Sequence, residues 1–196
     1  PMCNYRFTVN GFHELFQALK EVSGPEWAVK VKKDMPMLMI QGTADPVGDY
    51  DGQDQCWPVA KPGPQAMLAL LEETYGYIGG GNVSRNCHIG DRSEHKEGRA
   101  LDWYVDWNDP DQRAIADRLT TWLTRPDPLG NEVGRARRLG IMYMIWNRRI
   151  WNTVRADEGW RDYYGPSPHT DHVHFSFTWD GAWCETTWWE ATDCMD

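Results

Sequence analysis

Apolar and polar positions alternate along the chain with the two periods that distinguish helices from strands. Apolar residues three or four positions apart predict amphipathic helices, and short apolar runs bounded by turn residues predict strands. The predicted helices cover residues 11–22, 64–76, 110–123 and 131–139, and the predicted strands cover residues 36–40, 99–107, 141–146, 149–151 and 172–177. Asp109 is the expected N-cap of the helix over residues 110–123. This mixture is typical of an α+β fold, so we expect a small antiparallel sheet flanked by helices.

The chain divides where its composition changes. Gly, Pro and Asp are dense over residues 42–64, which predicts a boundary or a long loop. A length of 196 residues suits one domain with an appendage. We expect an N-terminal helix-and-strand appendage over residues 1–50, a main domain over residues 51–180 and a Trp-rich acidic tail over residues 181–196.

The tail carries three tryptophans, Trp183, Trp188 and Trp189, and from residue 180 onward it has five acidic residues and no basic one. Adjacent tryptophans can form a platform on which a glycan stacks, but aromatic side chains more often bury apolar area in a core. We therefore expect these side chains to pack over a disulfide between Cys184 and Cys194.

Charge and hydropathy exclude two classes of partner. The 20 basic and 29 acidic residues give a net charge of −9, and no long basic block is present, which argues against a nucleic-acid partner. The longest apolar stretch, residues 139–146, is far shorter than the roughly 18 residues that cross a bilayer. We expect a monomer with no membrane span.

Cysteine usage indicates an oxidising compartment. The chain has five cysteines and no CxxC motif, which argues against a zinc–thiolate site. Two disulfides and one spare thiol are typical of an exported protein, and we expect the pairs Cys56–Cys87 and Cys184–Cys194. The predicted location is secreted, either extracellular or in the cell wall.

The segment that is richest in candidate metal-binding residues runs from Ser93 to Asp102. A catalytic zinc ion needs three protein ligands and one open position, and His95, Asp102 and, far downstream, His174 can provide the three. Residues seven apart on a regular strand would point to opposite faces, so the hypothesis requires a loop between the first two ligands. Gly98 allows such a loop to turn.

Two residues beside His174 extend this constellation. Asp171 lies three residues before it, near the start of a predicted strand, where its carboxylate could accept a proton from water whose pKa a metal lowers to about 7. His172 shares a strand face with His174 because side chains alternate with period two. His172 could therefore be the ligand in place of His174, or a second hydrogen-bonding group. His88 and His169 flank the motifs, and we expect both to be loop residues.

These motifs resemble those of a known superfamily. Ser-x-His-x-x-Gly-x-Ala-x-Asp from Ser93 to Asp102, with acid-x-x-His at Asp171 and His174, is similar to the signature of the D-Ala-D-Ala zinc peptidases. That superfamily includes D-alanyl-D-alanine carboxypeptidases, D-alanyl-D-alanine dipeptidases and phage endolysins. The resemblance covers roughly residues 51–180.

The resemblance implies an α+β zinc peptidase with the metal in a cleft. It makes His95, Asp102 and His174 the Zn²⁺ ligands and Asp171 the catalytic base, one methylene shorter than the Glu of many relatives. It also implies an arginine upstream of the first ligand that holds the substrate carbonyl or carboxylate.

Arg85 is the better match for that arginine and Arg92 is the alternative. The implied function is hydrolysis of amide bonds in peptidoglycan stem or cross-link peptides. The alternative is a non-catalytic cell-wall-binding module that keeps the fold.

Residues 5–50 carry a second resemblance, to a late segment of the α/β-hydrolase lysophospholipases. In that family the acid of the catalytic triad would fall on Asp45. The chain contains no Gly-x-Ser-x-Gly nucleophile elbow, so a serine hydrolase cannot be assembled from it. We expect Asp45 not to be catalytic.

Overall fold

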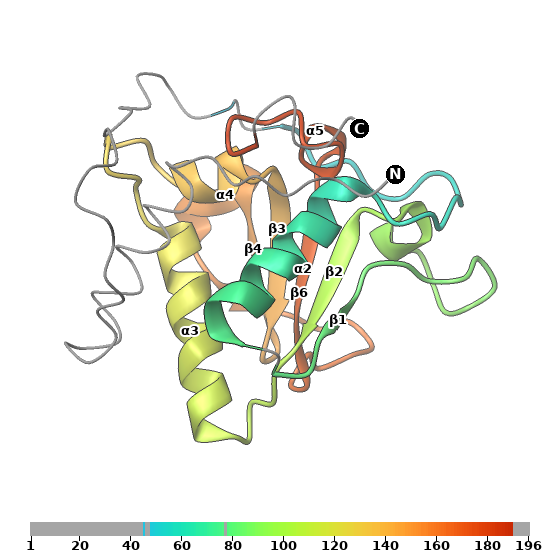
Figure 1. Ribbon diagram of the computed structural model, residues 1–196, viewed down its shortest axis with the longest axis horizontal. Coiled ribbons are helices and arrows are strands. Elements are labelled where there is room, and N and C mark those ends of the chain that lie inside the picture. Colours follow the sequence, from blue (N-terminus) through green and yellow to red (C-terminus); the bar gives the residue numbers. More distant parts are fainter. Residues whose placement is uncertain (1–44, 46–47, 77, 190–196) are drawn as a thin grey trace.

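The computed structural model describes residues 45, 48–76 and 78–189 (Figure 1). Its helices are α2 (Pro62–Tyr75), α3 (Pro110–Thr124), α4 (Gly134–Arg138) and α5 (Trp179–Ala182), with 3₁₀ helices η2 (Glu94–Glu97) and η3 (Thr153–Glu158). Its strands are β1 (Gly81–Asn82), β2 (Ala100–Tyr104), β3 (Ile141–Trp146), β4 (Arg149–Asn152), β5 (Arg161–Asp162) and β6 (His172–Phe177). The helix expected at residues 11–22 and the strand expected at 36–40 lie outside the described residues.

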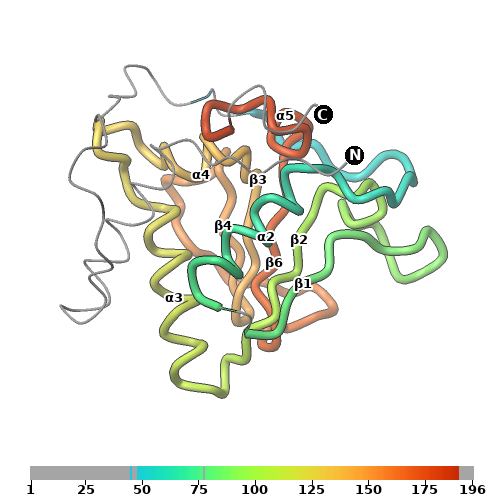
Figure 2. The backbone as a smooth tube through the Cα atoms, viewed as in Figure 1, coloured from blue at the N-terminus to red at the C-terminus, as the bar shows by residue number. Residues whose placement is uncertain are grey.

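The six strands form one open sheet in the order β1-β2-β6-β3-β4-β5, and every neighbouring pair is antiparallel. The predicted α+β class with an antiparallel sheet is therefore confirmed. Helices α2 and α3 lie over the same face of the sheet (Figures 1 and 2). Asp109 caps α3, as its sequence predicts, because its side chain accepts hydrogen bonds from the backbone N–H groups of Asp111 and Gln112.

The two faces of the sheet differ in chemistry. Under the helices lies the main core, in which Met67 and Leu119 pack with fully buried strand residues such as Trp103 and Phe175. Residues paired directly across antiparallel strands point to the same face. Asp102 pairs with His174, and His174 pairs with Ile145, so these side chains share the face opposite the helices.

The disulfide Cys56–Cys87 is present, as expected. Cys184 is also disulfide-bonded, but its expected partner Cys194 lies outside the described residues. Disulfides persist in oxidising compartments, so the pair is compatible with a secreted protein. Every described helix is too short or too polar to cross a bilayer.

The segments at both ends of the described chain pack on the main domain. Trp188 and Trp189 are buried, and the Trp188 ring meets Trp122 of α3 at a right angle, which confirms packing for these two tail tryptophans. Trp183 stays 40% exposed. The Asp45 carboxylate accepts hydrogen bonds from the backbone and hydroxyl of Thr187 in the tail.

Gly98 turns the chain between η2 and β2, as the ligand hypothesis requires. Its φ is +68°, and a Cβ built there would lie 1.9 Å from the carbonyl oxygen of Val59. Strain and clash together should lower the free energy of unfolding of Gly98→Ala by more than about 3 kcal/mol in urea denaturation.

Gly130 provides the matched control for this substitution. Its φ is +81°, but an added Cβ there meets nothing within 4 Å. Gly130→Ala should cost only the backbone term of about 1–2 kcal/mol. Equal losses in the two variants would contradict a specific close approach at Gly98.

Candidate metal centre

The loop that carries His95 is held rigidly from both ends. Ser93 Oγ accepts a hydrogen bond from the His95 backbone N–H at the start of η2, and Gly98 ends the turn by donating to the His95 carbonyl. All four residues of η2 are buried. His95 therefore sits on a short, fixed turn rather than on a mobile surface loop.

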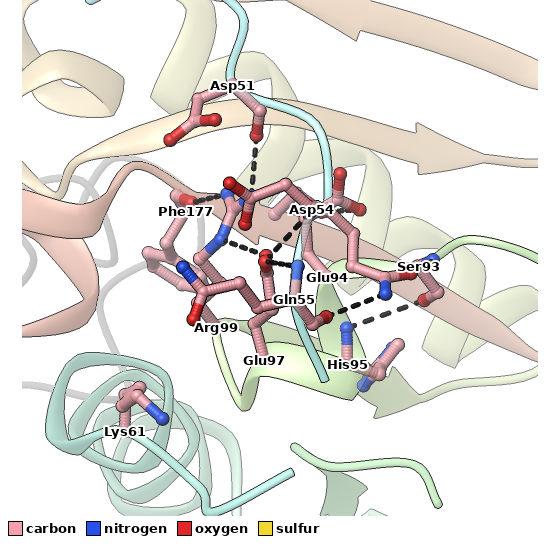
Figure 3. Close-up of polar contacts among 12 residues, drawn as sticks. Asp51, Asp54, Gln55, Lys61, Ser93, Glu94, His95, Glu97, Arg99 and Phe177 are labelled. Carbon is pink, nitrogen blue, oxygen red and sulfur yellow. Dashed lines mark hydrogen bonds and ion pairs between the residues drawn. The ribbon is translucent and has the colours of Figure 1, made fainter. Parts of the chain in front are cut away.

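A buried ion pair anchors this turn to the rest of the domain (Figure 3). Arg99 Nε donates to Glu97 Oε2 at 2.7 Å, and Arg99 Nη1 donates to the carbonyl of Phe177 on β6 at 2.8 Å. Glu97 Oε1 accepts from the backbone N–H groups of Asp54 and Gln55, both at 3.0 Å. Because both charges are paired and hydrogen-bonded, their burial is tolerated and fixes the turn against β6.

Three side chains meet on the open face of the sheet. His95 comes from η2, Asp102 from β2 and His174 from β6, and one ligand atom of each lies within 4.8 Å of the others. His95 Nε2 lies 3.0 Å and His174 Nδ1 2.7 Å from Asp102 Oδ1. Burial alone would raise the pKa of Asp102, but when the His174 and His95 rings carry a proton toward Oδ1, their hydrogen bonds and charge hold this pKa well below its ordinary value.

Each imidazole of the group, His95 and His174, has one nitrogen facing Asp102 and one facing away. The hydrogen bond made by the nitrogen that faces away determines whether the other presents a lone pair to Asp102. His95 Nδ1 lies 3.1 Å from the Val83 carbonyl oxygen, which can only accept, so Nδ1 carries the proton of the neutral ring. His95 Nε2, fully buried, then directs a lone pair toward Asp102 Oδ1 and donates no hydrogen bond to it.

His174 is oriented in the same way by a relay of buried groups. Its Nε2 lies 3.1 Å from Ser176 Oγ, and that hydroxyl donates to Glu94 Oε2 at 3.2 Å. Tyr143 OH also donates to Glu94 Oε2, at 2.5 Å, and its ring stacks on His174. With the proton on Nε2, the neutral His174 presents the lone pair of Nδ1 to Asp102.

Two imidazole lone pairs facing one carboxylate oxygen repel unless further protons or a cation lie between them. A tetrahedral metal with bonds of about 2.0–2.2 Å places its ligand atoms about 3.3–3.6 Å apart. His95 Nε2 and His174 Nδ1 lie closer than this to Asp102 Oδ1, at 3.0 and 2.7 Å, so the side chains would separate to admit the ion. Metal-binding histidines also carry outer hydrogen bonds of this kind. His95, Asp102 and His174 could therefore hold a metal ion.

Asp171 and His172 lie at the edge of this group as a hydrogen-bonded pair. His172 Nδ1–H donates to Asp171 Oδ1 at 2.7 Å, and His172 Nε2 lies 3.4 Å from Asp102 Oδ1. The Asp171 side chain is 82% exposed. His172 thus forms a hydrogen bond with Asp171 while its Nε2 faces Asp102, so both roles of His172, metal ligand and hydrogen-bonding group, stay predictions.

The two candidate arginines differ in position. Arg85 Nη2 lies 3.8 Å from Asp102 Oδ2, and about a third of its side chain is exposed (34%). The guanidinium of Arg92 instead donates to the carbonyl of Gln53. Of the two, Arg85 is therefore the arginine that the fold places beside the candidate metal ligand Asp102.

His169 belongs to the site, although its sequence position suggests an ordinary loop residue. It is 6% exposed, its φ is +49°, and its ring centroid lies 4.7 Å from that of His172 and 5.7 Å from that of His174. Burial lowers its pKa to about 4, so its imidazole is neutral. His88, the other histidine expected in a loop, is exposed.

Three further residues of the site were missed by sequence reasoning: Glu94, Tyr143 and Ser176. Glu94 precedes His95, and Ser176 follows His174 by two positions on the same strand face, so period two could have identified Ser176. Tyr143 carries no sequence signal, because its contact depends on the pairing of β3 with β6.

Comparison with known proteins gives one family match. The family model described as VldE, C-terminal domain, matches residues 54–174, which is more than half of the chain and includes all the predicted metal ligands. No curated protein and no solved structure matches the chain. The chain therefore belongs to the VldE C-terminal domain family.

Proposed function

We propose that this protein is a zinc metallopeptidase that hydrolyses amide bonds in peptidoglycan stem or cross-link peptides. The observation that carries the proposal is the convergence of two imidazole lone pairs on the Asp102 carboxylate, beside an exposed carboxylate and a guanidinium. Two histidines and one carboxylate form a ligand set that Zn²⁺ favours, with a fourth position open. When bound, zinc would polarise the scissile carbonyl and lower the pKa of water to about 7.

The Asp171–His172 pair supplies the proton acceptor. Asp171 fixes the proton of His172 on Nδ1, which leaves the basic Nε2 facing the centre, while the exposed Asp171 carboxylate is itself open to an incoming water. In either route the proton passes to this pair and returns from it to the leaving amine. We assign Asp171 as the base and His172 as its hydrogen-bonding partner.

Arg85 orients the substrate. A guanidinium 3.8 Å from Asp102 Oδ2 can bind the substrate carbonyl or carboxylate next to the metal ligands. The same group stabilises negative charge as it develops on the carbonyl oxygen during attack.

The assignment of a cell-wall substrate rests on the resemblance of the motifs at Ser93–Asp102 and Asp171–His174 to D-Ala-D-Ala zinc peptidases. A disulfide compatible with export agrees with a substrate outside the cell. The family match adds no activity to this argument.

Digestion of defined muropeptides tests the proposal. The purified chain with Zn²⁺ should release D-alanine or split a cross-link, as shown by mass spectrometry of the products. The activity should stop on chelation and return when zinc is restored. Binding of muropeptides without any cleaved product would contradict a peptidase and favour the cell-wall-binding alternative.

A further inference from the structure

A cavity of about 670 Å³ opens on the same face of the sheet as the metal centre. It lies over β3, β4 and the segment that follows them, and its lining includes Tyr50, Tyr143, Ile150, Asn152, Arg161 and Tyr163. A volume of this size admits an amino-acid residue or a short peptide. The cavity belongs to none of the roles assigned so far.

The cavity begins where the metal centre ends. Tyr143 and Ile145, which line it, pair across the sheet with Ser176 and His174. The Tyr143 ring stacks on His174 at 5.6 Å between centroids. A peptide bound at the metal centre would therefore extend over Tyr143 into the cavity.

Arg161 is the cationic group in the cavity with the most unused hydrogen-bonding capacity. Arg155 also lines the cavity, but its Nε and Nη2 are committed to Glu158 at 2.5 and 2.6 Å. Arg161 donates to Asn152, its contact with Glu158 is long at 3.4 Å, and its buried Nε has no acceptor among the described residues. A guanidinium has five N–H donors, so several of those of Arg161 remain available.

The surroundings of Arg161 favour a carboxylate as its ligand. The planar guanidinium fork matches a carboxylate, and such charge-assisted hydrogen bonds strengthen where water is partly excluded. Asp162 also lines the cavity, but it is exposed, so solvent screens its charge. The side chain of Arg161 is 20% exposed, so its positive charge is the less screened of the two.

We propose that this cavity is a substrate subsite for a carboxylate-bearing residue of the peptide, with Arg161 as the residue that binds the carboxylate. The proposal rests on the proposed peptidase function and narrows its substrate class to peptides that place a carboxylate in this cavity. The carboxylate can come from an acidic side chain or from the peptide C-terminus. Amidation of one or the other separates these two sources.

Calorimetry on the full chain, with and without Zn²⁺, tests the subsite independently of turnover. The probes are L-Ala-γ-D-Glu-L-Lys-D-Ala-D-Ala, the same peptide with the D-Glu α-carboxylate amidated, and the same peptide with its C-terminus amidated. One amidation should weaken binding about 10- to 100-fold and the other should not. Equal affinity for all three peptides would overturn the subsite.

Arg161→Met should weaken binding of the unmodified peptide by a similar factor. It should leave unchanged the affinity for the peptide whose critical carboxylate is amidated. Arg149→Met is the matched control, because Arg149 is exposed on neighbouring β4, donates to the Trp160 carbonyl and does not line the cavity. Should Arg161→Met fail to fold, the comparison of the three peptides on the unaltered chain still shows whether the cavity selects a carboxylate.

The subsite and the peptidase can fail separately. Cleavage of all three peptides with equal affinity would reject the subsite and keep the peptidase. Carboxylate-selective binding that depends on Arg161, without cleavage of any peptide, would keep the subsite and reject the peptidase.

Discussion

His95→Ala is expected to abolish metal binding. The unaltered chain should contain about one zinc ion per molecule by elemental mass spectrometry, and the variant should lose it with an affinity fall greater than about 100-fold. Loss of a group that only hydrogen-bonds to a metal ligand already lowers the affinity for the metal by about 10–100-fold. Loss of a ligand itself should lower that affinity further. Peptidase activity should disappear with the metal.

His88→Ala provides the control, because His88 is an exposed histidine in the loop before η2. It should keep both the metal and the activity. Circular dichroism distinguishes loss of the metal from loss of the fold, since the Glu97–Arg99 pair and the Ser93 cap still hold the turn in the His95 variant. A full complement of zinc in His95→Ala, or no zinc uptake by the unaltered chain, would remove the proposed centre.

The local features of this fold could be predicted because local chemistry determines them. Strand β6 has the predicted bounds, residues 172–177, because its apolar alternation is uninterrupted. The Asp109 cap and Gly98 turn also followed from single residues whose backbone preferences are strong. Residue type, spacing and the resemblance to zinc peptidases indicated His95, Asp102 and His174 as candidates, and the fold does place them within ligand reach of one another.

The parts that escaped prediction depend on strand pairing. Tyr143 reaches Glu94 and His174 only because β3 pairs with β6 in one register, and a shift of one residue would turn its side chain to the other face. His169 resembles a loop residue in sequence, but the turn that carries it folds back so that its ring packs against His172. The cavity around Arg161 likewise joins β3, β4 and β5, which no local pattern brings together.

Asp171→Asn is expected to reduce kcat about 100- to 10,000-fold while zinc content and substrate affinity stay unchanged. The amide oxygen of Asn can still accept the hydrogen bond from His172 Nδ1–H, so the geometry of the pair survives, but the amide cannot take up a proton. Stopped assays of muropeptide cleavage with the zinc-loaded variant measure the change. Asp91→Asn, an exposed carboxylate in the loop before η2, should leave kcat unaltered.

His172→Gln then determines which member of the pair accepts the proton. If Asp171 acts directly, loss of the His172 imidazole costs less than loss of the Asp171 carboxylate, because Asp171 remains exposed and free to act. If the proton instead enters through His172 Nε2, which lies 3.4 Å from Asp102 Oδ1, His172→Gln has the larger effect. That outcome would reassign the base to His172, and unaltered kcat in both variants would exclude the pair from proton transfer altogether.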